Sequence, residues 1–131
     1  IKKYGLWRED LNLNDDWEFS LRYVLNCYKQ IFFLNEVSSL YRDHDNDRIG
    51  RGFTPQKMDS FINSLETIFL TSLKTNRINN YLRFRYLKRY TYCFIQCRKL
   101  GHTKGQQQII KNVKKINTLY SIFLRLFTHK K

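Results

Sequence analysis

Residues 54–73 read TPQKMDSFINSLETIFLTSL, and this stretch determines the expected fold class. Its apolar side chains recur every three or four residues, which is the period of a helix with one buried face. Pro55 follows Thr54 at the point where a helix would begin, and proline is favoured at the first helical position. The stretch therefore predicts a long amphipathic helix whose apolar positions are Met58, Phe61, Ile62, Leu65, Ile68, Phe69 and Leu73.

Three further stretches have the same helical period. Residues 15–28 predict an amphipathic helix, with Asp15 and Glu18 spaced as a capping box and Asp16 in the first turn. Residues 81–100 predict a second helix, and residues 107–127 a third, with two glycines between them. The apolar positions of the last helix form one continuous stripe, which consists of Ile109, Ile110, Val113, Ile116, Leu119, Tyr120, Phe123 and Phe127.

The remaining residues predict one small β element and loops. Residues 31–34 and 37–41 indicate two short extended segments joined by a tight turn, and residues 43–52 a polar loop. We therefore expect a mainly α fold with three or four helices and a short two-stranded β element. We divide the chain into residues 1–53 and a helical tail at residues 54–131.

The charge of the chain is divided between two halves. The net charge of the whole chain is +13. Residues 1–66 contain nine Lys and Arg and all eleven Asp and Glu, so this half does not contribute to the positive charge. Residues 67–131 contain fifteen Lys and Arg and no acid. A surface without any acidic side chain suits a negatively charged partner, so the tail is expected to meet one.

The cysteines argue against a disulfide-stabilised protein, and the short apolar runs argue against a membrane-spanning one. Cys27, Cys93 and Cys97 are sparse and odd in number, which argues against a disulfide scaffold and indicates a reducing compartment. We expect Cys93 and Cys97 to be buried thiols, because a zinc site would need further ligands beyond His102. The longest apolar run, residues 31–34, is far below the span of about 20 residues that crosses a bilayer.

Two motifs carry a resemblance to a known family. Residues 14–22 read NDDWEFSLR, and residues 40–44 read LYRDH. Here the sequence resembles the inverting family 2 glycosyltransferases of the GT-A fold, which carry E-D-W-x-x-x-x-R at a helix start and a later Tyr-Arg-x-His run. Asp15 stands where that family more often has Glu. The resemblance covers about residues 5–53 and implies the C-terminal, acceptor-side part of a GT-A α/β catalytic domain, followed by the basic helical tail.

The resemblance also implies a role for five residues. Asp16 corresponds to the general base, which takes the proton from the acceptor hydroxyl as that oxygen attacks the anomeric carbon. Asp15 is the alternate base or an acceptor-orienting group, and Trp17 forms an apolar wall for a sugar ring. Arg42 and His44 are placed near the donor pyrophosphate or its metal, where a cation or imidazole offsets the charge of the leaving group.

The implied reaction transfers a sugar from a nucleotide diphosphate sugar to a glycan or lipid-linked acceptor, in cell-envelope or extracellular polysaccharide synthesis. In this family, an N-terminal half with an Asp-x-Asp element binds the donor and a divalent metal, Mg²⁺ or Mn²⁺. Residues 43–47 have Asp-x-Asp spacing but follow the first helix, so we interpret them as a loop and expect no metal in this chain. Lacking the donor half, the chain is expected to be inactive alone.

Four of these five residues also have a purely structural interpretation. Asp15 and Asp16 suit the start of a helix for electrostatic reasons alone. Trp17 on the apolar face of a helix is more often a core residue than a ligand platform. His44 lies in a polar run and is an ordinary loop histidine if the resemblance is set aside.

The basic tail leaves three interpretations open. Residues 81–92 alternate cations with aromatic side chains on the predicted helix. This pattern is typical of attachment to an anionic membrane surface, of nucleic-acid binding, or of a helical bundle whose long cations extend to solvent. We favour the membrane for residues 81–131, which predicts a cytoplasmic protein peripheral on the inner face of the cell membrane. The alternative is a non-catalytic basic helical module that binds nucleic acid.

Overall fold

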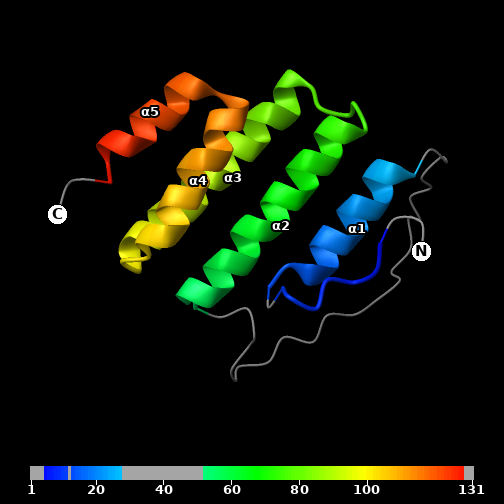
Figure 1. Cartoon of the computed structure of the whole chain (residues 1–131), viewed down its shortest axis with the longest axis horizontal. Coiled ribbons are helices and arrows are strands. Elements are labelled where there is room, and N and C mark those ends of the chain that lie inside the picture. Colours follow the sequence, from blue (N-terminus) through cyan, green and yellow to red (C-terminus); the bar gives the residue numbers. More distant parts are fainter. Residues whose placement is uncertain (1–4, 12, 28–51, 129–131) are drawn as a thin grey trace, which may run out of the picture.

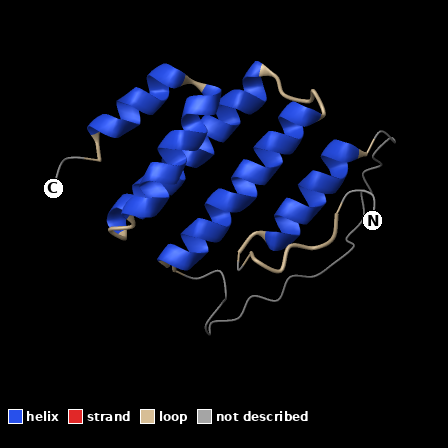
Figure 2. Ribbon diagram, viewed as in Figure 1, coloured by secondary structure: helices blue, strands red, loops and turns tan. Residues whose placement is uncertain are grey.

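The computed structural model describes residues 5–11, 13–27 and 52–128, and every regular element in those residues is a helix (Figure 2). The prediction of a mainly α chain is confirmed. The predicted two-stranded element lies outside the described residues. The helices are α1 (Asp15–Asn26), α2 (Pro55–Lys74), α3 (Asn80–Lys99), α4 (Thr103–Ile116) and α5 (Thr118–Leu126).

α2 is the central helix and begins as its sequence predicts. The Thr54 Oγ1 atom accepts a hydrogen bond from the Lys57 backbone N–H at 3.2 Å, and Pro55 occupies the first helical position. This cap satisfies one of the backbone donors that the first turn leaves without an intrahelical partner. α2 contacts α1, α3 and α4, and its buried apolar residues are Met58, Ile62, Leu65, Ile68 and Phe69.

α2, α3 and α4 surround the apolar core, and the other two helices extend this group on either side (Figure 1). α1 packs on α2 through Trp17, Leu21 and Leu25, and α5 packs on α4. α1 and α5 therefore lie at opposite ends of the molecule (Figure 1). The core residues from α3 and α4 are Tyr86, Tyr90, Cys93, Phe94, Cys97, Ile109, Ile110 and Val113.

The prediction of one helix over residues 107–127 is wrong. Asn117 has an extended backbone (φ −155°, ψ 111°), which ends α4 and begins α5. Its Oδ1 atom accepts a hydrogen bond from the Tyr120 backbone N–H at 2.9 Å, so the asparagine caps the second helix. The described residues consequently contain five helices, more than the three or four predicted. The extra helix was not predicted because the apolar period is the same on both sides of Asn117, whereas the side chain of Asn117 stabilises a separate helix start.

The start of that helix was also misplaced. Gly101 has φ +66° and ends α3, but Gly105 lies inside α4 and is buried. A Cβ atom at Gly105 would lie 2.5 Å from the His102 Cδ2 atom and 2.8 Å from the Cys97 Sγ atom. Gly105 is therefore needed for close packing rather than for a turn, and α4 begins at Thr103.

Candidate functional site

The chain enters α1 through a sharp turn, and the predicted capping box is absent. Asn14 adopts a left-handed conformation (φ 61°), which asparagine tolerates better than most residues, and its side chain makes no capping hydrogen bond. Asp15 is the first helical residue rather than the cap. Glu18 does not reach back to the turn, because its buried carboxylate is paired with Arg22 one turn further on.

The two carboxylates at this helix start have different environments. Asp15 is half-buried, and its Oδ2 atom accepts a hydrogen bond from Trp7 Nε1 at 3.0 Å. Asp16 is exposed, and its Oδ1 atom accepts from the backbone N–H of Trp17 at 2.6 Å. The N-terminus of a helix favours negative charge at both positions. Asp15 is thus held by a neighbouring side chain, whereas Asp16 faces solvent.

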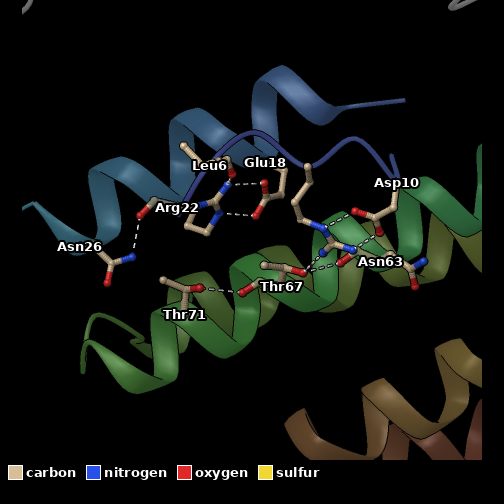
Figure 3. A network of polar contacts seen from close by, with 9 residues as sticks. Leu6, Asp10, Glu18, Arg22, Asn26, Asn63, Thr67 and Thr71 are labelled. Atoms are coloured by element: carbon tan, nitrogen blue, oxygen red, sulfur yellow. Dashed lines mark hydrogen bonds and ion pairs between the residues drawn. The ribbon is translucent and has the colours of Figure 1, made fainter. Parts of the chain in front are cut away.

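A buried ion pair holds the N-terminal segment against α1 (Figure 3). Arg22 donates from Nε to Glu18 Oε1 at 2.7 Å and from Nη2 to Glu18 Oε2 at 3.2 Å. The same Nη2 atom donates to the Leu6 carbonyl oxygen at 2.8 Å. Removing one partner of such a buried pair leaves an uncompensated charge, which typically destabilises a protein by about 3–5 kcal/mol.

A second arginine, Arg8, fixes the same segment to α2 through Thr67. Arg8 forms an ion pair with Asp10, and its Nη1 atom donates to Thr67 Oγ1 at 2.6 Å. Next to Arg8, the ring of Trp7 lies 5.0 Å from the ring of Phe19. Residues 5–11, α1 and α2 are therefore joined at several points, and these contacts position the helix start that carries the two carboxylates.

Asp16 and Trp17 line a hollow of about 270 Å³ that three helices build. α2 contributes Phe61, and α3 contributes Arg89, whose guanidinium is exposed. The hollow thus combines a carboxylate, two aromatic rings and a cation. This combination can bind a sugar ring by apolar contact and orient its hydroxyl groups by charged hydrogen bonds.

Further cations continue along α3 from this hollow. Arg89 also lines a second hollow, together with Arg85, Lys88 and Tyr92. These residues are spaced by three and four positions, so they lie on one side of α3. Arg85 and Arg89 also line a hollow with Trp17 of α1, where they can attract an anionic group of a ligand.

The structure describes three of the five predicted site residues. Asp15, Asp16 and Trp17 lie together at the start of α1. Arg42 and His44 lie outside the described residues. The local sequence pattern did not identify Phe61 and Arg89, which reach the hollow from helices distant along the chain.

Cys93, Cys97 and His102 do not line this hollow. Cys93 and Cys97 are buried, as predicted, and burial raises the pKa of the Cys93 thiol to about 12 and of the Cys97 thiol to about 11. His102 Nε2 lies 2.6 Å from Asp59 Oδ1. In residues 5–11, 13–27 and 52–128, no cluster of His, Cys, Asp or Glu has the arrangement of a metal site.

Comparisons of the chain with family models, with curated proteins and with solved structures give no match. Within the described helices, none has a run long and apolar enough to cross a bilayer. The interpretation of the site therefore depends on its own geometry and on the motifs at residues 14–22 and 40–44.

Proposed function

We propose that this chain is the acceptor-side part of an inverting glycosyltransferase, which transfers a sugar from a nucleotide diphosphate sugar to a glycan or lipid-linked acceptor. The observation that supports the proposal most is the position of Asp16. Its exposed carboxylate lies at a helix N-terminus and lines a hollow with Trp17 and Arg89. The resemblance of residues 14–22 and 40–44 to family 2 glycosyltransferases supports the same conclusion.

In this proposal Asp16 is the general base. The acceptor hydroxyl oxygen forms a bond to the anomeric carbon, and the bond from that carbon to the nucleotide diphosphate breaks. The hydroxyl proton passes to the Asp16 carboxylate, and the nucleotide diphosphate leaves with the bonding electron pair. Trp17 and Phe61 provide an apolar wall for the sugar, and Arg89 donates hydrogen bonds to the acceptor.

Other residues position the base or act on the donor. Asp15 receives the Trp7 hydrogen bond and fixes the entry to α1, so we assign it an orienting role. Arg42 and His44 are proposed to lie near the donor diphosphate in the complete enzyme. The described residues contain no set of ligands that fits the expected Mg²⁺ or Mn²⁺, so no step is assigned to a metal here.

The test is Asp16→Asn in the complete enzyme, assayed for sugar transfer and for donor affinity. Loss of a general base should lower turnover by about 10²–10⁴-fold while donor affinity stays unchanged, and loss of the charge at the helix N-terminus should lower stability by at most about 1 kcal/mol. Glu9→Gln is the matched control, because Glu9 is an exposed acid outside the hollow. Near-normal turnover of the Asp16→Asn enzyme would show that Asp16 is not the base.

A further inference from the structure

α5 directs an apolar face to solvent. Its outward side chains are Leu119, Ile122, Phe123 and Leu126, which are 79%, 51%, 49% and 67% exposed. Their spacing of three and four residues places them on one side of the helix. Large apolar side chains grouped on one exposed face usually mark an interaction surface, whereas single exposed ones need no explanation.

The inward side of α5 is small and less apolar than its outward side. Ser121 and Leu124 are the buried residues of this helix. Tyr120 bonds to α3, because its hydroxyl lies 2.8 Å from Thr91 Oγ1. Along the helix, the Phe123 ring lies 5.9 Å from the Tyr120 ring and 4.9 Å from the Phe127 ring. α5 is therefore fixed in an orientation that keeps its larger apolar side uncovered.

A mainly apolar hollow of about 530 Å³ adjoins this face between α3 and α5. Phe94 and Ile95 line it from α3, and Phe123 and Phe127 line it from α5. Arg98 and Lys99, both exposed, also line it. A hollow with apolar walls and cations beside it suits an acyl chain whose headgroup carries a phosphate.

The positive charge of residues 67–131 favours an anionic bilayer over a second copy of the chain as the partner of the exposed α5 face. Residues 67–131 contain fifteen Lys and Arg and no acid. A second copy that covered the face with its own α5 would bring two acid-free surfaces together, and like charges would repel. An anionic bilayer offers both an apolar interior for the leucines and negative headgroups for the cations.

We propose that α5, together with the C-terminal part of α3, binds the surface of an anionic phospholipid membrane. α5 lies in the plane of the interface, with Leu119, Ile122 and Leu126 inserted below the headgroups. Arg98, Lys99 and Arg125 contact the lipid phosphates. This surface lies at the end of the molecule opposite α1 (Figure 1), so the proposal does not depend on the assignment of Asp16.

The test is flotation of this chain with vesicles of equal parts phosphatidylglycerol and phosphatidylcholine, and with vesicles of phosphatidylcholine alone. The double variant Leu119→Gln, Leu126→Gln should partition to the mixed vesicles at least about tenfold more weakly, because it removes two inserted leucines. The matched control is Leu70→Gln, Leu73→Gln, which changes two leucines on α2 that are 44% and 39% exposed. It should partition as the parent chain does.

The parent chain should also bind the mixed vesicles much more tightly than the neutral ones, and salt should weaken that binding. Equal partitioning of the Leu119→Gln, Leu126→Gln chain and the parent chain would overturn the proposal. So would a parent chain that binds no vesicles but self-associates in sedimentation velocity through the same two leucines. Thermal unfolding of both double variants checks that each remains folded.

Discussion

α4 and α5 are consecutive helices with the same apolar period, yet the apolar face of α4 lies in the core and that of α5 faces solvent. α4 places Ile109, Ile110 and Val113 in the core. α5 places Leu119 and Phe123 on its exposed side, although both belong to the same stripe in the sequence. An apolar period thus identifies a helix and its apolar face, but the packing partner decides whether that face is buried.

The turn at Asn117 produces this difference. An uninterrupted helix would continue the stripe along one side of α4. The extended backbone of Asn117 instead changes the direction of the chain, and α5 then packs on α4 through Ser121 and Leu124. The first two predictions below test how differently the two helices contribute to stability, and the third tests a contact between α4 and α2.

The largest expected effect compares a buried residue with an exposed one. Ile109→Ala in α4 should lower the free energy of unfolding by about 3 kcal/mol, since it leaves a cavity at a fully buried position. Leu126→Ala in α5 should change it by no more than about 0.5 kcal/mol. Urea unfolding followed by circular dichroism measures both. Similar losses for the two variants would mean that α5 is covered.

An intermediate effect is expected at the junction. Asn117→Ala removes the side-chain cap of α5 and should cost about 1 kcal/mol of helix stability. Hydrogen exchange should then become faster for the amides of α5 and stay nearly unchanged for those of α4. Asn79→Ala, which removes the equivalent cap of α3, is the matched control and should leave α5 unaffected. Uniform acceleration across α4 and α5 would argue against two separate helices.

The smallest effect concerns a polar contact that α4 has with α2. Glu66 accepts hydrogen bonds from Lys115 Nζ at 2.7 Å and from Asn112 Nδ2 at 3.1 Å. Burial by itself would raise the pKa of Glu66, but these hydrogen bonds outweigh it and lower the pKa below the ordinary value of 4.5.

The sign of the pH dependence follows from that lowered pKa. The unfolded chain binds the Glu66 proton at a higher pH than the folded chain does, so the stabilisation is present above pH 4.5 and is lost as the pH falls below it. Glu66→Gln should therefore remove up to about 1 kcal/mol at neutral pH and less at lower pH. Urea titrations at several pH values measure this, and a pH-independent loss would contradict it.

The sequence predicted the helices best where local signals agreed with one another. Thr54, Pro55 and seven apolar positions all indicated α2, and the structure confirms that helix. The break at Asn117 was missed because both sides of it have the same period and asparagine is also found within helices. Gly105 was misassigned to a turn because its actual role, contact with His102 and Cys97, depends on tertiary packing.

The candidate site was predictable only in its local part. Asp15, Asp16 and Trp17 are adjacent in the sequence, so a single helix start brings them together. Phe61 and Arg89 join them only because α2 packs on α1 and α3 packs on α2, and no short motif predicts that arrangement. The spacing of Asp15 and Glu18 suggested a cap, but the pairing of Glu18 with Arg22 takes precedence because it satisfies a buried charge.

The chain has two tryptophans: Trp17 lies in the first turn of α1, and Trp7 lies beside that turn. Trp7 bonds to Asp15, and Trp17 lines the hollow with Asp16. The intrinsic tryptophan fluorescence of this chain therefore reports on one end of the molecule only. A ligand in the hollow should therefore change this fluorescence and the proposed lipid binding at α5 should not, so one titration of unlabelled protein can distinguish the two events.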